Sequence, residues 1–340
     1  MKPAAPPTRE DTDRAGGDQE MALRRALAET LRDARGGVRR LATVRRRPFA
    51  ETTAFRAELL TLELADGERL EIFLKDLSWS RLAKDDLQGR RRRELEVYRR
   101  LLPPSGLGPP RYHGAVWDER RRRFWLLLEL VDGRRLGECK APLWEAAAGW
   151  LGRLHGEFGG REQLLRRSAA LQRHDQEFFL RAAERAEREL GRLSRTLARR
   201  LGGLLSGYDE IARWMASAPP TLVHGSYRPQ NILVAGPPAE PRICPVDWEL
   251  AAIGSRLHDL AYLADGWEPP ALDALLDAYE SKARECDVPV PPRTELRAGL
   301  DRFRFHRSVA SLGHCAGWRQ PDSTAVKVLG MADRLRHRLG

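Results

Sequence analysis

The sequence predicts an α+β protein with two lobes, a small antiparallel β lobe followed by a larger, mainly helical one. At 340 residues the chain exceeds the usual size of a single domain, so two compact parts are expected. Apolar runs of strand length occur before residue 131, at 69–74 and 124–131. Beyond Gly133 the apolar residues recur with helical spacing. These three observations together define the fold class.

The chain divides into four segments. Residues 1–20 are rich in proline, glycine and charge, which predicts a disordered tail. Residues 21–35 have the periodicity of a helical extension. We expect the small lobe at 36–131 and the large lobe at 132–340.

A lysine and a helix stand out in the small lobe. Lys75 closes the strand-like run 69–74, either in solvent or facing a ligand. Residues 93–102 have helical spacing, and this helix offers Glu94 as a carboxylate partner for the lysine, with Glu96 as the alternative. Either glutamate could equally be a solvent-facing helix charge.

The apolar run 124–131 stops at Asp132 and Gly133. Because glycine allows a sharp change of backbone direction, this pattern predicts a buried strand that leads into a hinge between lobes. An ordinary core strand is compatible with the same pattern.

The most informative motif is His-Gly-Ser-Tyr-Arg-Pro-Gln-Asn at residues 224–231, followed by Asp-Trp-Glu at 247–249. The apolar runs 232–235 and 243–246 flank a turn-rich stretch, which predicts a hairpin. A hairpin there would hold the loop 224–231 and Asp247 on one rigid element. Asn231 and Asp247 carry the oxygen ligands that a hard divalent ion prefers.

This two-part motif resembles the catalytic core of the aminoglycoside phosphotransferase and choline kinase superfamily, which has a bilobal, protein-kinase-like fold. The family pattern is His-Gly-Asp-x-x-x-x-Asn, followed by an apolar strand that ends in Asp or Asp-x-Glu. The resemblance extends from about residue 45 to 319, and it includes Trp-Leu-Gly-Arg-Leu-His at 150–155 and His-Asp-Leu-Ala at 258–261. Ser226 stands where the family has its catalytic Asp.

The resemblance implies a role for each matching residue. Ser226 and His224 would lie at the catalytic position, and Lys75, positioned by Glu94, would bind the α- and β-phosphates of ATP. The backbone carbonyl of Glu129 and the amide of Val131 would hold adenine. Asn231 and Asp247 would bind Mg²⁺, and Glu249 would support a second ion.

The segment that should cover the phosphates, residues 45–55, contains no Gly-x-Gly-x-x-Gly pattern. Backbone amides with the hydroxyls of Thr52 and Thr53 could still cradle a phosphate, because an anion-binding nest needs exposed amides rather than glycine. A plain β-turn is the alternative.

Two functional hypotheses follow from the resemblance. The first is an ATP-dependent phosphotransferase acting on a hydroxyl of an unidentified small metabolite or antibiotic. The second is a nucleotide-binding pseudokinase with a regulatory or scaffold role and a protein partner. Ser226 favours the second, whereas Lys75, Asn231 and Asp247 favour the first.

Composition narrows the class of protein further. The net charge of +11 would suit a nucleic-acid binder. However, the basic residues are spread along the chain, and only six of the 59 are lysine. No nucleic-acid partner is therefore predicted. No apolar stretch approaches a membrane span, and none at the start resembles a signal peptide. The four cysteines show no paired spacing, which favours a reduced, cytoplasmic protein without zinc or disulfides.

The large lobe should be built from helices. Residues 144–155 have a buried stripe, which makes His155 a core or helix-end histidine. A long amphipathic stretch at 178–205 is of the type that covers an acceptor site, or else is only a solvated helix face. Further helices are expected at 272–279 and 302–312.

Overall fold

The computed structural model describes residues 9–31, 40–50, 54–286 and 288–339. The chain forms two compact units, Met1–Asp132 and Gly133–Gly340, and the division falls one residue beyond the expected end of the small lobe. The first unit contains an antiparallel sheet and the second is mainly helical, so the predicted α+β class is confirmed.

A five-stranded sheet in the order β1-β2-β3-β5-β4 organises the first unit, and all neighbouring strands are antiparallel. Its elements are α1 (Arg9–Thr30), β1 (Leu41–Phe49), β2 (Phe55–Leu64), β3 (Arg69–Ser80), α2 (Leu87–Glu96), β4 (Tyr112–Asp118) and β5 (Arg123–Glu129). After Glu96 the helix continues as a π-helical turn, Val97–Leu101.

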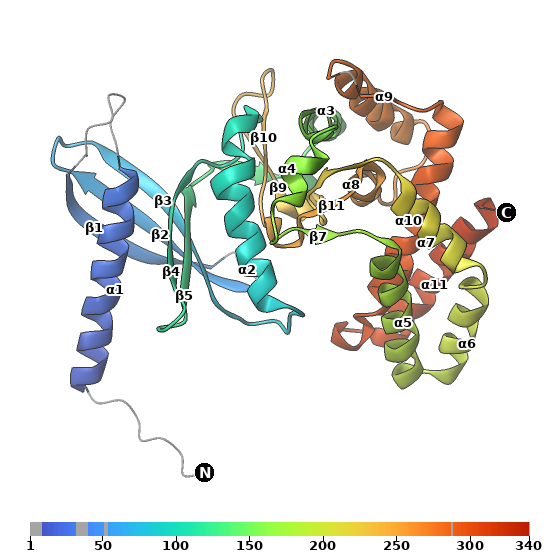
Figure 1. The fold of residues 1–340 in the computed structure, drawn as a ribbon, viewed down its shortest axis with the longest axis horizontal. Coiled ribbons are helices and arrows are strands. Elements are labelled where there is room, and N and C mark those ends of the chain that lie inside the picture. The colour runs from blue at the N-terminus through green and yellow to red at the C-terminus, as the bar shows by residue number, and fades with distance from the viewer. Residues whose placement is uncertain (1–8, 32–39, 51–53, 287, 340) are drawn as a thin grey trace, which may run out of the picture. The chain divides into compact units, whose positions relative to one another are not determined.

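Helices α1 and α2 lie on opposite sides of this sheet (Figure 1). Ile72 and Leu74 belong to the apolar cluster that includes Leu23 and Leu27 of α1. Because successive residues of a strand point to opposite faces, Lys75 points away from α1. Its face of the sheet is the one that α2 covers, as the contact between Lys75 and Glu94 shows.

Three details of the first unit differ from the sequence prediction. The N-terminal helix begins at Arg9 rather than after residue 20, because Leu23 and Leu27 anchor a helix that extends toward the N-terminus through polar residues. Residues 1–8 lie outside the described part. Lys75 is in the middle of β3, which runs on to Ser80. Residues 45–49, expected in a phosphate-covering loop, belong to strand β1.

The second unit carries nine helices and six short strands within the described residues. The strands are β6 (Gly133–Arg135), β7 (Gln172–Arg173), β8 (Pro220–Val223), β9 (Ile232–Ala235), β10 (Arg242–Pro245) and β11 (Ala252–Ser255). The helices are α3 (Ala141–Phe158), α4 (Glu162–Arg166), α5 (Gln176–Leu193), α6 (Arg195–Leu204), α7 (Tyr208–Ser217), α8 (Arg256–Leu263), α9 (Ala271–Arg284), α10 (Arg293–Leu312) and α11 (Pro321–Arg338).

The expected hairpin is present, because β9 and β10 pair antiparallel with Ala235 opposite Arg242. Strand β6 pairs with β9 on the other side and completes a three-stranded sheet. A second small sheet has the order β7-β11-β8. The loop 224–231 therefore runs between β8 of one sheet and β9 of the other.

The long helical stretch predicted at 178–205 is two helices, α5 and α6. Ser194 separates them with an extended backbone, and its hydroxyl accepts a hydrogen bond from the amide of Leu197 at the start of α6. His155 is a core residue, as expected, and its Nδ1 lies 3.0 Å from the hydroxyl of Tyr279.

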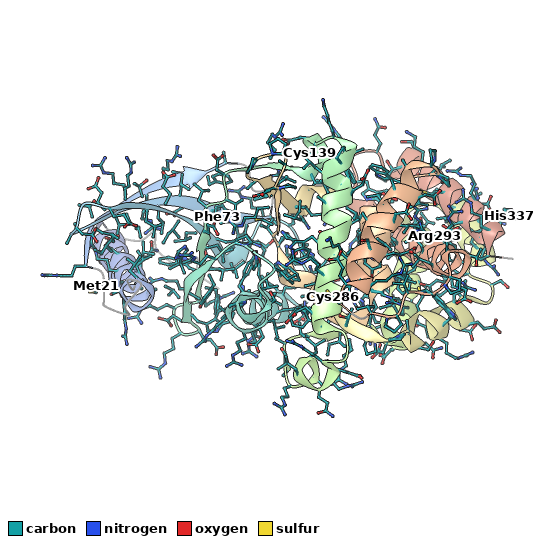
Figure 2. All side chains as sticks on the ribbon, turned by 90° about the horizontal axis from the view of Figure 1, so that it is seen from above. Met21, Phe73, Cys139, Cys286, Arg293 and His337 are labelled. Atoms are coloured by element: carbon teal, nitrogen blue, oxygen red, sulfur yellow. The ribbon has the colours of Figure 1, made fainter. Side chains whose placement is uncertain are left out.

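All four cysteines are free thiols. Figure 2 shows Cys139 and Cys286 near opposite ends of α3. Among the described residues, no helix combines the length and the apolar character needed to cross a membrane.

Candidate active site

The loop 224–231 begins with a sharp turn that requires glycine. Gly225 has a φ of +80°, and a Cβ at this position would lie 2.0 Å from the carbonyl oxygen of Leu250. Only glycine combines this left-handed backbone with such a close approach. The turn allows the backbone amides of His224 and Gly225 to point together into the core.

A buried carboxylate receives both amides. The carboxylate of Asp259 in α8 accepts hydrogen bonds from the amides of His224 at 2.6 Å and Gly225 at 2.9 Å, and its side chain is fully buried. Burial is the largest influence on this carboxyl and by itself raises the pKa of Asp259. Contacts with His155, His224 and His258 outweigh burial, so the pKa of Asp259 lies below its ordinary value. Asp259 is therefore a charged anchor for the start of the loop.

The loop is also tied to the end of strand β10. The Nε2 of His224 lies 3.0 Å from the carbonyl oxygen of Val246, and the amide of Val246 donates to the carbonyl oxygen of Asn231 at 2.8 Å. Both ends of the loop thus contact one residue. The next residue, Asp247, has a left-handed backbone with a φ of +68°, a conformation that a non-glycine residue rarely adopts.

His224 is buried, and both of its ring nitrogens have partners. The amide of Ser226 donates to Nδ1 at 3.3 Å, which leaves Nε2 as the donor to Val246. Burial, only partly opposed by Asp259 and Asp247, lowers the pKa of His224. A neutral histidine fixed at both nitrogens supports the loop.

Ser226 lies inside the loop and is only 3% exposed. The side-chain amide of Asn231 donates to the Ser226 carbonyl at 3.1 Å and to its hydroxyl oxygen at 3.3 Å. Because Nδ2 of Asn231 is occupied in this way, its Oδ1 is the atom left to accept other contacts. Glu249 follows in the short 3₁₀-helix Trp248–Leu250 with a buried side chain, whereas Asp247 is partly exposed.

The structure also shows the contacts and positions of the residues of the first unit that were expected to bind nucleotide. The ammonium of Lys75 donates to both carboxylate oxygens of Glu94, at 2.7 and 2.8 Å, while the alternative partner Glu96 binds Arg100. Glu129 ends strand β5, and Val131 follows just before the division between the units. Thr52 and Thr53 lie outside the described residues.

Asp259 is the site residue that sequence reasoning did not single out. The motif His-Asp-Leu-Ala at 258–261 belonged to the family resemblance, but no role was assigned to its carboxylate. One signal was present, because an aspartate between the buried apolar residues Leu257 and Leu260 is rarely tolerated without a partner. The backbone amides that it binds could not be inferred from side-chain patterns.

Comparison with known proteins identifies the class. The model of the phosphotransferase enzyme family matches residues 67–297, which is more than half of the chain. The chain therefore belongs to this family, whose members are phosphotransferases acting on hydroxyl groups. No protein of curated function matches the sequence significantly.

Solved structures of the same fold agree with this assignment. The GDP and kanamycin complex of aminoglycoside phosphotransferase APH(2")-IIIa is 16% identical with a TM-score of 0.62, over 86% of this chain and 94% of that one. A choline kinase from Cryptosporidium parvum is 12% identical with a TM-score of 0.58, over 87% and 90%. The macrolide 2'-phosphotransferase MphH from Brachybacterium faecium is 15% identical with a TM-score of 0.55, over 92% and 97%. At these identities the likeness establishes the fold.

Proposed function

We propose that this protein transfers the terminal phosphate of ATP to a hydroxyl group of a small molecule. The observation that carries the proposal is the connection of His224 and Asn231 to the same residue, Val246, which places the loop beside Asp247. Phosphoryl transfer depends chiefly on positioning and charge stabilisation, and a loop fixed at both ends provides positioning.

Nucleotide binding is assigned to Lys75 and to residues 129 and 131 of the first unit. Lys75, held by Glu94, supplies the cation for the α- and β-phosphates. The backbone carbonyl of Glu129 and the amide of Val131 are suited to the adenine edge, by analogy with the family. A solved relative supports nucleotide use, since the aminoglycoside phosphotransferase of similar fold is a GDP complex.

The residues present fit Mg²⁺ as the cofactor. This ion prefers oxygen ligands and usually binds through one or two carboxylates together with phosphates. Oδ1 of Asn231 and the carboxylate of Asp247 are oxygens of this kind. Glu249, whose side chain is buried, would support a second ion. When bound, the ion would neutralise charge on the ATP phosphates.

The reaction can proceed without a carboxylate at residue 226. The acceptor hydroxyl oxygen forms a bond to the γ-phosphorus, the bond from that phosphorus to the bridging oxygen breaks, and ADP leaves with the electron pair. The hydroxyl proton passes to water. General acid–base help is typically worth about 10²–10⁴-fold, so its loss makes such an enzyme slower without abolishing transfer.

A cytoplasmic location belongs to the same proposal, since four free thiols suit a reducing compartment.

A second candidate function is that of a nucleotide-binding pseudokinase with a protein partner. The observation that favours it is the engagement of the Ser226 hydroxyl with Asn231 in a buried position. In this position the Ser226 hydroxyl takes part in the hydrogen bonding of the loop, and it provides no carboxylate that could act as a general base for an acceptor hydroxyl.

One experiment separates the two functions. The purified full-length protein is incubated with Mg-ATP and pools of hydroxylated metabolites, and the formation of ADP and of a phosphorylated product is measured together. A product formed in proportion to ADP supports the enzyme. Nucleotide binding without any product supports the pseudokinase, and absence of nucleotide binding excludes both.

A further inference from the structure

An exposed arginine lies on the loop two residues after Ser226. The amide of Arg228 donates to the Ser226 carbonyl at 2.8 Å, and the Arg228 carbonyl accepts from the amide of Asn231 at 2.8 Å, so its backbone is fixed in the loop. Within the described part of the chain, its guanidinium has no hydrogen bond or ion pair. An arginine that no carboxylate neutralises is available to bind an anion.

A second arginine lies beside the same loop. Arg307 of α10 lies over the ring of Tyr262 in α8, with 5.2 Å between its guanidinium carbon and the ring centroid. Asp265 binds both terminal nitrogens of Arg307 and fixes its position. Tyr262 is one helical turn beyond His258, and the rings of these two residues are 5.3 Å apart. His258 in turn lies 3.4 Å from the carbonyl oxygen of Gly225, which joins this group to the loop.

The charges of both arginines reach the hydroxyl of Tyr262. Burial raises the pKa of Tyr262, and Arg307 and then Arg228 oppose that rise by favouring the phenolate. The positive charges of Arg307 and Arg228 therefore act on the same tyrosine, a residue of intermediate exposure.

The carboxylates around this group are already engaged. Asp259 binds backbone amides, Asp265 binds Arg307, and Glu268 binds Arg338. Residue 226 contributes a neutral hydroxyl. Asp247, also beside the loop, is the residue assigned to Mg²⁺, and within the described residues no carboxylate forms an ion pair with Arg228. Its positive charge therefore suits a negatively charged ligand and disfavours a cation.

We propose that the acceptor is an alcohol that carries an anionic group, a carboxylate or a phosphate ester, and that Arg228, assisted by Arg307 and Tyr262, binds this group. The proposal rests on the proposed phosphotransferase function and deepens it. A carboxylate at residue 226 would repel such an acceptor, so Ser226 becomes a determinant of acceptor charge.

The test measures ligand binding to the full-length protein with its nucleotide site filled by Mg²⁺ and a non-hydrolysable ATP analogue. The anionic probes are D-glycerate and glycerol 3-phosphate, the neutral counterparts are glyceramide and glycerol, and choline is the cationic probe. We expect saturable binding of at least one anionic probe, weaker binding of its neutral counterpart and none of choline. The pair of anions also distinguishes a carboxylate from a phosphate ester.

Variants then assign the binding to Arg228. Arg228→Gln should weaken the anionic probe about tenfold or more, the range of one charge-assisted hydrogen bond, and Arg228→Lys should retain part of the affinity. Ser226→Asp should weaken the anionic probe more than the neutral one. Arg213→Gln, on the exposed surface of α7, is the matched control and should change nothing.

The outcomes distinguish a failure of the proposed phosphotransferase function from a failure of the anionic-acceptor proposal. If the ATP analogue itself fails to bind, the proposed function fails. If the analogue binds but neither anion does, or if Arg228→Gln leaves anion binding unchanged, only the anionic acceptor is excluded. A loss of affinity for the nucleotide analogue in Arg228→Gln, with anion binding intact, would instead assign Arg228 to the nucleotide phosphates and overturn the proposal.

Discussion

The carboxylate of Glu94 accepts two hydrogen bonds from the ammonium of Lys75 and is completely buried, while the lysine side chain is 12% exposed. Breaking such a pair leaves a buried charge without compensation. Lys75→Met should therefore lower the free energy of unfolding by about 3–5 kcal/mol. The double variant Lys75→Met/Glu94→Leu should recover most of that loss. Urea unfolding of both variants measures it, and equal losses in the two would contradict the prediction.

Nucleotide binding should depend on Lys75 and on Asp247. Mg-ATP at a hundred times its dissociation constant adds roughly 2.7 kcal/mol of stability and raises the melting temperature. Asp247→Ala, and the double variant at Lys75 and Glu94, should largely remove this rise. Lys282→Ala is the control, because Lys282 pairs with Glu285 at the C-terminal end of α9. A rise that persists in both site variants would sink the assignment of these residues.

Asp259 should be essential to the shape of the loop. In Asp259→Asn one side-chain oxygen becomes an amide that cannot accept, so one of the amides of His224 and Gly225 is left buried without a partner. A cost of about 1–3 kcal/mol is expected, together with faster hydrogen exchange at the two amides. Asp209→Asn, an exposed carboxylate on α7, should have no such effect. Unchanged exchange at His224 and Gly225 would remove Asp259 from its role as the anchor.

Stability should fall with acidification through His306. Burial, reinforced by His258, lowers the pKa of His306 to about 3 from an ordinary value of 6.5. Between these values the unfolded chain binds a proton that the folded protein does not, so stability is lost as the pH falls from about 6.5 toward 3. His306 contributes a slope of up to about 1.4 kcal/mol per pH unit in this window.

The variant His306→Asn removes this titration and retains an acceptor for the Tyr208 hydroxyl, which lies 2.6 Å from Nδ1. Its unfolding free energy should depend less steeply on pH than that of the natural protein. His337→Asn, on the exposed end of α11, is the control and should keep the natural slope. Equal slopes in all three proteins would contradict the buried, neutral state of His306.

Helix α1 should stabilise the first unit through its apolar residues. Leu27 is fully buried against the sheet, so Leu27→Ala should cost about 2–5 kcal/mol. Met21 is 65% exposed on the same helix and points outward (Figure 2), so Met21→Ala should change stability by no more than about 0.5 kcal/mol. Thermal unfolding of the two variants measures the difference, and similar costs would show that α1 does not pack as described.

The parts of the fold that sequence could predict are those with strong local patterns. The hairpin of β9 and β10 followed from two apolar runs around a turn, and the buried strand β5, which ends at Glu129, followed from the apolar run 124–131. The apolar periodicity gave the wrong helix boundaries at two places, once because of a polar residue and once because of a tertiary contact. Ser194 interrupts an amphipathic pattern that reads as one helix, and α1 extends through polar residues because tertiary packing holds its other end.

The candidate site was predictable in its residue types and less so in their roles. The spacing of Asn231 and Asp247 was visible in the sequence, because the hairpin fixes it. The support given by His224 was not, since it depends on hydrogen bonds between its two ring nitrogens and main-chain atoms, Nδ1 accepting from the Ser226 amide and Nε2 donating to the Val246 carbonyl. Side-chain patterns carry no information on main-chain partners, and this also explains why Asp259 had no assigned role.

The loop 224–231 is held largely by main-chain groups, namely the amides of His224 and Gly225 and the carbonyls of Val246 and Asn231. None of these contacts depends on the side chain of residue 226. A substitution at residue 226 therefore leaves these contacts in place and removes only the hydrogen bond between the Asn231 side-chain amide and the Ser226 hydroxyl. A substitution at this one position can therefore change which acceptor is preferred, while the residues assigned to the nucleotide and to Mg²⁺ stay unchanged.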